Sequence, residues 1–197
     1  MYVTEESQIP VAALPVTQLR AHLRLGSGFA EDDLQDGLLE GFLRAAIATV
    51  EARTGKALIT RDFLCVLNRW RDVTGQILPI APVSDVTQMS LVDRFGGVVV
   101  VEAGSYSVLP DAEAPRVCPV GAALPPVPDH GSVEIRFRAG MVSAFGDLPA
   151  DLAQAVMLLA AHYYEYRDET SLSQGCMPFG VTSLIARYRP VRLGFGA

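Results

Sequence analysis

The sequence has few of the side chains on which chemistry usually depends. It holds three histidines and three cysteines in 197 residues, and Lys56 is its only lysine. Cys65, Cys118 and Cys176 are odd in number, widely spaced and form no CxxC pair. A disulfide framework and a zinc site are therefore both disfavoured.

Long hydrophobic runs are missing as well. No apolar stretch approaches the roughly 18 residues that cross a bilayer, although 50% of the residues are hydrophobic. The first ten residues, MYVTEESQIP, carry two glutamates where a secretory signal needs basic residues and then an apolar stretch. We therefore expect a soluble protein with no membrane partner, whose surplus apolar surface is buried against other subunits.

Basic charge and catalytic motifs are also scarce. The net charge is −6, which disfavours a conventional DNA-binding surface. The sequence has no phosphate-binding loop, no GxGxxG and no GxSxG. His162 and Glu165 have the i,i+3 spacing of a metal half-site, but no second ligand pair accompanies them. We predict a structural protein rather than an enzyme, with no catalytic residue, no metal and no cofactor.

The two ends of the chain have helical periodicity. A short helix is predicted over 18–25 with Thr17 as its N-cap, and a longer helix over 30–54. Gly55 follows the longer helix at the position where glycine commonly ends a helix. Near the C-terminus a long apolar helix is predicted after Asp147, followed by a short basic and aromatic helix.

Between these ends the apolar residues recur with a period of two. Val133, Ile135 and Phe137 alternate with charged residues, as in a half-buried strand. The sequence DRFGG at 93–97 is typical of a hairpin turn. Six prolines occur between 110 and 131, and we predict a loop there.

These patterns predict an α+β fold, in which helices from both ends of the chain form a small bundle and a β-rich region is inserted between them. The predicted parts are an extended N-terminal arm over 1–16, a helical part over 17–57, a β-rich insertion over 58–146 with the proline-rich loop over 110–131, C-terminal helices of the bundle over 147–189, and a C-terminal tail over 190–197.

The long C-terminal helix has more apolar surface than one core face requires. Leu152, Val156 and Leu159 lie on one side of it, and Met157 and Ala161 lie on another. Either the helix is the centre of its own bundle, or its second face contacts a neighbouring subunit. For the second case, and because Tyr and Arg are enriched in binding hot spots, the predicted inter-subunit residues are Met157, Ala161, Tyr164, Tyr166 and Arg167.

The chain ends in a basic, aromatic and apolar segment. Its positive charges could complement the dipole of the preceding helix, or the segment could dock onto an acidic partner. Leu193 and Phe195 favour docking, because apolar side chains left in water gain nothing. The predicted docking residues are Arg187, Tyr188, Arg189, Val191, Arg192, Leu193 and Phe195.

Ordered segments over residues 17–190 resemble one known family. They are EARTGKALITRDF, ILPIAPVSDVTQMSLVD, SYSVLP, IRFRAG, DLPADLAQAVMLLAAHYYEYRDE and PFGVTSLIARYRP. In this order they are similar to the head–tail connector (adaptor) proteins of long-tailed phages, which also occur in phage-like particles such as gene transfer agents. Met141 departs from the family, which often has an aromatic residue there, and the tail after Pro190 does not align.

The resemblance implies a homo-oligomeric ring, commonly a dodecamer, beneath the portal protein of a virion or phage-like particle. Its tail side would receive a stopper protein, and DNA would pass through the lumen during ejection without specific binding. Assembly would take place in the bacterial cytoplasm, from a phage, prophage or gene transfer agent gene. The alternatives are a nucleic-acid-binding packaging factor and a small hydrolase that uses His162 and Glu165.

Overall fold

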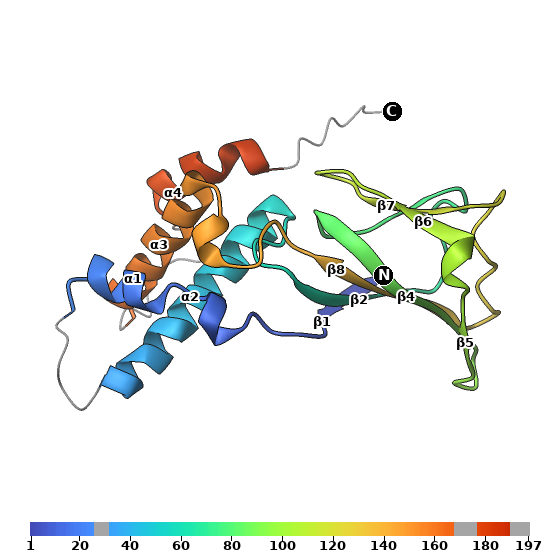
Figure 1. Cartoon of the computed structure of the whole chain (residues 1–197), viewed down its shortest axis with the longest axis horizontal. Helices are drawn as coiled ribbons and strands as arrows, with labels where there is room; N and C mark the ends of the chain where they lie inside the picture. Colours follow the sequence, from blue (N-terminus) through green and yellow to red (C-terminus); the bar gives the residue numbers. More distant parts are fainter. Residues whose placement is uncertain (26–31, 168–176, 190–197) are drawn as a thin grey trace. The chain divides into compact units, whose positions relative to one another are not determined.

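The computed structural model describes residues 1–25, 32–167 and 177–189 (Figure 1). The chain divides into two compact units, one formed by residues 1–9 and 59–141, and the other by 10–58 and the chain from 142 onward. The first unit contains all the described strands and the second contains the four α-helices. The predicted α+β class is confirmed.

The strand unit is built on a five-stranded antiparallel sheet. Alternation in its central strand follows the prediction, because Val133, Ile135 and Phe137 are fully buried and Arg138 is exposed. In the order β1-β2-β8-β4-β5, the strands are Tyr2–Glu5, Arg61–Leu67, Ser132–Ala139, Val83–Val92 and Val98–Val100.

Phe137 is at the centre of this sheet. It lies opposite Phe63 of β2 and Val86 of β4, and its ring stacks on that of Phe63 with centroids 5.6 Å apart. The Arg61 guanidinium covers the Phe63 ring at 4.7 Å. Gly140 ends the strand at φ 151°, and a Cβ there would lie 2.3 Å from Thr60 Cα, so only glycine fits.

A smaller sheet has the order β3-β7-β6, with bounds Gln76–Ile77, Arg116–Pro119 and Tyr106–Leu109. Strand β7 lies inside the segment for which the sequence predicts only a loop. Val117 is fully buried between the exposed Arg116 and half-buried Cys118, so the strand is too short for its alternation to stand out among the prolines. Later in the same segment, Trp70 Nε1 donates a hydrogen bond to the Pro125 carbonyl at 2.7 Å.

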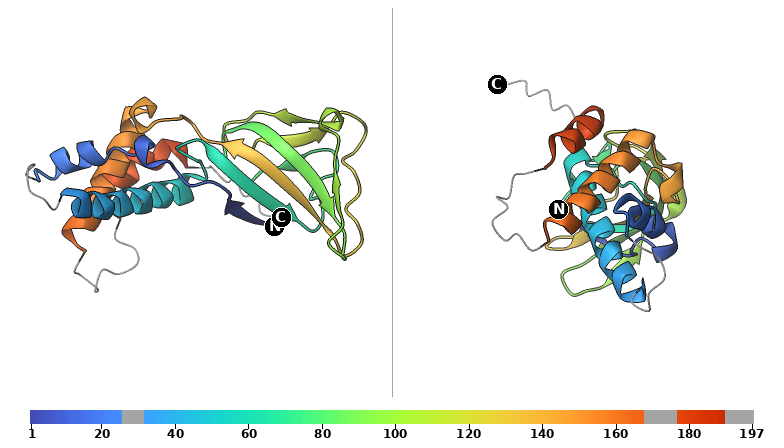
Figure 2. Two further views of the ribbon diagram at one scale, coloured as in Figure 1. Left: turned by 60° about the horizontal axis from the view of Figure 1, so that its bottom comes forward. Right: turned by 90° about the vertical axis from the view of Figure 1, so that its left-hand side faces the viewer.

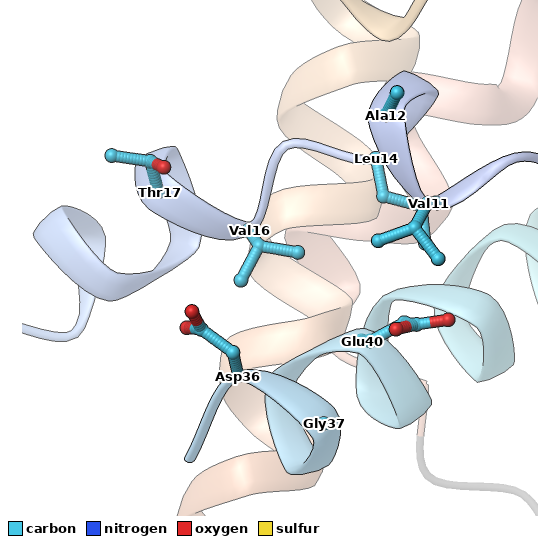
Figure 3. Close-up of a pocket in the computed structure, with 8 residues that line it drawn as sticks. All are labelled: Val11, Ala12, Leu14, Val16, Thr17, Asp36, Gly37 and Glu40. Carbon is cyan, nitrogen blue, oxygen red and sulfur yellow. The ribbon is translucent and has the colours of Figure 1, made fainter. Parts of the chain in front are cut away.

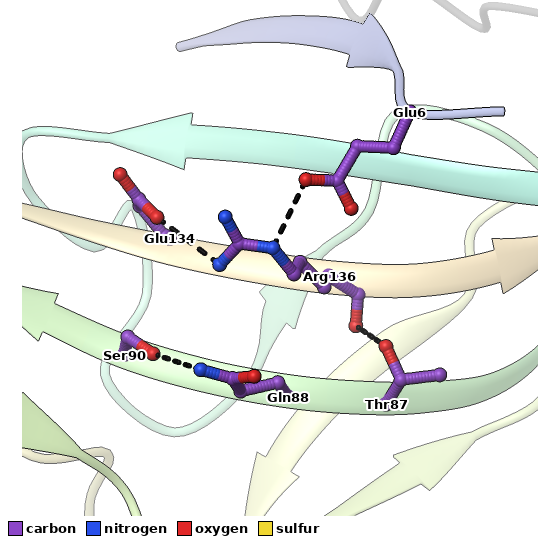
Figure 4. A network of polar contacts seen from close by, with 6 residues as sticks. All are labelled: Glu6, Thr87, Gln88, Ser90, Glu134 and Arg136. Carbon is purple, nitrogen blue, oxygen red and sulfur yellow. Dashed lines mark hydrogen bonds and ion pairs between the residues drawn. The ribbon is translucent and has the colours of Figure 1, made fainter.

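The face of the large sheet opposite to that of Val133, Ile135 and Phe137 is polar (Figure 4). Arg136 donates from Nε to Glu6 at 3.0 Å and from Nη1 to Glu134 at 3.2 Å, and its carbonyl accepts from Thr87 at 3.2 Å. Arg138 likewise pairs with Asp62 at 2.9 Å. The arginines of this face are therefore matched by carboxylates and do not form a basic patch.

The second unit is a helical bundle (Figures 1 and 2). Helix α3 is at its centre and contacts the other three helices. The helices are α1, Val16–His22; α2, Asp32–Thr54; α3, Ala150–Glu165; and α4, Phe179–Ile185. Short 3-10 turns lie at Val11–Ala13 (η1), Phe145–Asp147 (η3) and Ala186–Tyr188 (η4), and a further one, η2, at Ala103–Ser105 in the strand unit.

Two predicted helix ends can be compared with the structure. Thr17 does not cap α1: the N-cap is Pro15, whose carbonyl accepts from Leu19 N at 2.9 Å. The end of α2 is as predicted, because Gly55 follows it at φ 68° and donates to the Glu51 carbonyl at 2.8 Å.

Candidate functional site

Most of the surplus apolar surface of α3 is buried against other parts of the same chain. Leu152, Val156 and Leu159 are buried, as expected of a core face. Met157 and Ala161, predicted on a second face, are also buried, at 8% and 7% exposure. Because α1, α2 and α4 all contact this helix, the burial of these two residues favours the first explanation, in which the helix is the centre of its own bundle.

The C-terminal end of α3 is different, because its aromatic side chains remain accessible. The Tyr164 ring meets Phe42 of α2 edge-on at 6.0 Å, and the Arg167 guanidinium lies 4.6 Å above the same ring. Tyr166 is exposed and its ring packs 4.6 Å from His162. We call Phe42, His162, Tyr164, Tyr166 and Arg167 the aromatic cluster.

This cluster contains one residue that sequence reasoning overlooked. Phe42 is half-buried and supports Tyr164, whereas Leu38, one turn before it on α2, is exposed. The buried stripe of α2 is instead formed by residues such as Leu39, Leu43 and Ile47. The sequence could have indicated this role of Phe42, because α2 has apolar residues on more sides than the buried stripe occupies.

The basic end of the chain is attached to the start of α3. Arg187 Nε lies 2.8 Å from one carboxylate oxygen of Asp151, and the Tyr188 hydroxyl donates to the other at 2.9 Å. The Arg187 guanidinium also lies 4.7 Å above the Tyr188 ring. Arg189 is exposed. The remaining predicted docking residues, Val191, Arg192, Leu193 and Phe195, lie outside the described residues.

Asp151 is the electrostatic centre of this attachment. Burial alone would raise its pKa, but hydrogen bonds from Tyr188 and Leu152 N, together with the charge of Arg187, outweigh burial and hold the pKa below its usual value. Its position in the first turn of α3 also favours a negative charge. Arg187 and Tyr188 therefore hold the end of the described chain against the start of α3.

We expect Asp151→Asn to lower the free energy of unfolding by about 1 kcal/mol at pH 7, since it removes a charged acceptor and a favourable helix-terminus charge. The folded-state pKa is depressed, so the contribution is complete above the unfolded pKa near ~4 and is lost as the pH falls through the folded value. Urea unfolding at pH 7 and pH 3 measures both, with Asp129→Asn as an exposed control. An equal loss at both pH values would exclude the charge as the cause.

The bundle also contains a shallow pocket of about 470 Å³ between η1, α1 and α2 (Figure 3). Its two carboxylates are already neutralised, because Asp36 pairs with Arg20 and Glu40 pairs with Arg44 at 2.7 Å. Its lining, which offers no nucleophile beside a base, is Val11, Ala12, Leu14, Val16, Thr17, Asp36, Gly37 and Glu40.

His162 and Glu165 acquire no further ligands in the described ranges. No group of three or more His, Cys, Asp or Glu side chains among the described residues could hold a metal ion. His162 instead packs against Tyr166, and Glu165 is exposed. Nor, among the helices described, is any both long and apolar enough to cross a bilayer.

Comparison with known proteins gives matches of full length. Neither a protein-family model nor a curated protein matches the chain. Among solved structures, the chain is 49% identical to one in the neck of an empty gene transfer agent (GTA) particle computed with C6 symmetry, with a TM-score of 0.88. It is 48% identical to one in the virion of a native GTA particle and 45% identical to one in the neck of a native GTA particle computed with C12 symmetry, with TM-scores of 0.84 and 0.83.

All three similarities cover 100% of this chain and 99% of the matched chain. Similarity at this level defines the class of the protein: it is a structural component of a phage-like particle. The chain belongs to the same family as these chains of the GTA neck and virion.

Proposed function

We propose that the protein is a head–tail adaptor: a ring, a dodecamer, that joins the portal to the tail-side stopper and leaves a channel for DNA. The observation that carries this proposal is the full-length similarity to chains of GTA necks computed with C6 and C12 symmetry. The adaptor resemblance of the sequence, from EARTGKALITRDF to PFGVTSLIARYRP, agrees with a neck position.

The charge of the molecule suits a channel that DNA must traverse without binding. The net charge is −6, and on the polar face of the large sheet Arg136 and Arg138 are paired with carboxylates. Nonspecific DNA binding depends on a protein neutralising phosphates with Lys and Arg. Such pairing favours a structural channel over the alternative of a nucleic-acid-binding packaging factor.

The aromatic cluster is our candidate for a lateral contact between neighbouring subunits. Tyr164, Tyr166 and Arg167 combine exposed aromatic area with a guanidinium at the end of one helix, which is the composition of interface hot spots. Met157 and Ala161, which precede Tyr164 on α3, are buried in the bundle and leave the contact to the residues at the end of the helix.

The C-terminal segment is our candidate for the attachment to the portal. Arg187 and Tyr188, which precede residues 190–197, are held at Asp151 on the bundle. The tail carries Arg192, Leu193 and Phe195, a charge with two apolar anchors, and such short segments commonly bind by ordering on a partner.

The lateral contact is tested by the double variant Tyr166→Ala/Arg167→Ala. We expect its self-association to be at least ~30-fold weaker, since truncating a hot spot costs about 2 kcal/mol or more. Mass photometry of the purified protein with the portal protein measures ring formation. Glu165→Ala, a change at the neighbouring exposed position, is the matched control and should leave the rings intact. Rings of normal stability in the double variant would remove the aromatic cluster from the interface.

A further inference from the structure

The most exposed apolar surface of the strand unit is the hairpin formed by β4 and β5 (Figure 1). Phe95 at its tip is 82% exposed, and Val98, Val99 and Val100 are 60%, 64% and 61% exposed. Three consecutive exposed valines mean that neither face of β5 is covered by the unit. β5 is also the last strand of the large sheet, and natural edge strands are usually blunted with Lys or Pro rather than left apolar.

The hairpin is nevertheless well ordered at its tip. The Asp93 carboxylate accepts from Phe95 N at 2.7 Å and from Gly97 N at 2.8 Å. Asp93 N donates to the Gly97 carbonyl at 2.9 Å, and Gly96 has φ 84°. The hydrogen bonds of the turn fix the backbone around the exposed Phe95 ring. Binding a partner there would therefore cost little conformational entropy.

The backbone bonds of the hairpin show which groups of β5 face outward. Gly97 accepts from Asp93, and Val101 N donates to the Met89 carbonyl at 2.9 Å, so residues 97, 99 and 101 face β4. By alternation, the N–H and C=O groups of Val98 and Val100 point away from the sheet. No other described strand pairs with that side of β5.

The opposite border of the same sheet is β1, whose outer side is likewise unpaired among the described strands. Glu6 N donates inward to the Asp62 carbonyl at 2.9 Å, so Val3 and Glu5 present their backbone groups outward. Tyr2 is 59% exposed. The two borders are similar in length, four residues in β1 and three in β5.

We infer that these two borders meet between copies of the chain: β5 of one subunit pairs with β1 of the next. The inference rests on the proposed ring, in which every contact joins two different surfaces of the same chain. The two open borders of one sheet are such a pair. The rotation that relates neighbouring subunits of a large ring turns a strand only slightly. β1 and β5 run the same way within the sheet, because four antiparallel steps separate them. The intermolecular pairing is therefore parallel.

Parallel pairing also defines a register. Val3 lies opposite Val99 of the neighbouring copy: Val3 N–H donates to the Val98 carbonyl, and Val100 N–H donates to the Val3 carbonyl. Tyr2 then lies against Val98, so an exposed aromatic ring covers an exposed valine. Thr4 lies opposite Val100, and both side chains are exposed in the single chain.

The first test is Val100→Pro, which removes an outward N–H without removing an inward bond and is tolerated at a sheet edge. We expect the variant to fold and to enter particles at least tenfold less than the natural chain, as quantified by mass spectrometry of purified particles. Val120→Lys, at a valine that is 67% exposed and belongs to neither border strand, should enter particles normally. The pair Val98→Lys/Val100→Lys is the second variant and should lose incorporation in the same way. Normal incorporation of Val100→Pro and of this pair would overturn the inference.

The second test is a cysteine pair, Thr4→Cys with Val100→Cys, in a chain whose Cys118 and Cys176 are replaced by serine. Cys65 can stay, because it is buried and burial raises the pKa of its thiol to about 11. Mild oxidation of particles should give covalent multimers, and Thr4→Cys with Val120→Cys should not. Particles that contain rings of the chain but give no multimers overturn this inference alone. Particles that lack the chain overturn the proposed function, and this inference with it.

Discussion

Removal of residues 190–197 is expected to leave the protein folded and to weaken its attachment to the portal strongly. The last described residue is Arg189, and the contacts of Arg187 and Tyr188 with Asp151 lie before the cut, so the bundle keeps its attachment. The tail alone contributes Arg192, Leu193 and Phe195 to the portal contact that we propose. Losing two apolar anchors and a charged group should weaken binding at least a hundredfold.

Binding of the truncated chain to purified portal protein measures this effect, with circular dichroism as the check on folding. The matched control is Leu193→Ala/Phe195→Ala, which keeps the tail length and should reproduce most of the loss. A truncated chain that binds the portal as the natural one does would remove the tail from the interface. The aromatic cluster would remain as a separate proposal, because the truncation removes none of its residues.

The second large effect concerns the strand unit. Phe137→Ala is expected to lower the free energy of unfolding by about 3–5 kcal/mol, the range for a large aromatic residue lost from a core. Phe137 is fully buried, lies opposite Phe63 and Val86, and stacks on the Phe63 ring. Its loss therefore leaves a cavity between three strands.

Phe95→Ala is the matched control for this prediction. It removes the same side chain from a site that is 82% exposed, so its effect should be within about 0.5 kcal/mol. Urea unfolding followed by near-ultraviolet circular dichroism compares the two variants. Similar stabilities of the two variants would contradict the position of Phe137 at the centre of the sheet.

Much of the fold could be predicted from the sequence where local pattern and tertiary packing agree. The alternation of Val133, Ile135 and Phe137 gave the central strand β8 almost to its ends, and the turn at 93–97 joins β4 to β5 as expected. Gly55 ended α2 because a glycine at positive φ is a local requirement. The prediction failed for β7, because Pro115 before the strand and Pro119 at its end obscured a strand of four residues.

The assembly surfaces were harder to predict, because apolar periodicity does not say which subunit covers a side chain. Met157 and Ala161 are apolar on a second side of α3, yet their own bundle buries them. Phe42 lies on an apolar side of α2, and only the structure shows that its ring meets Tyr164. Val98, Val99 and Val100 follow the predicted turn at 93–97, and their exposure depends on the border position of β5, which the sequence does not reveal.

Electron microscopy of the neck in particles produced with this chain tests the central claim most directly. The adaptor proposal predicts a ring of twelve copies of the chain between the portal and the tail-side stopper, with an open channel at its centre. A complete neck in which the chain is absent, or in which it occupies any position other than that between portal and stopper, would contradict the account.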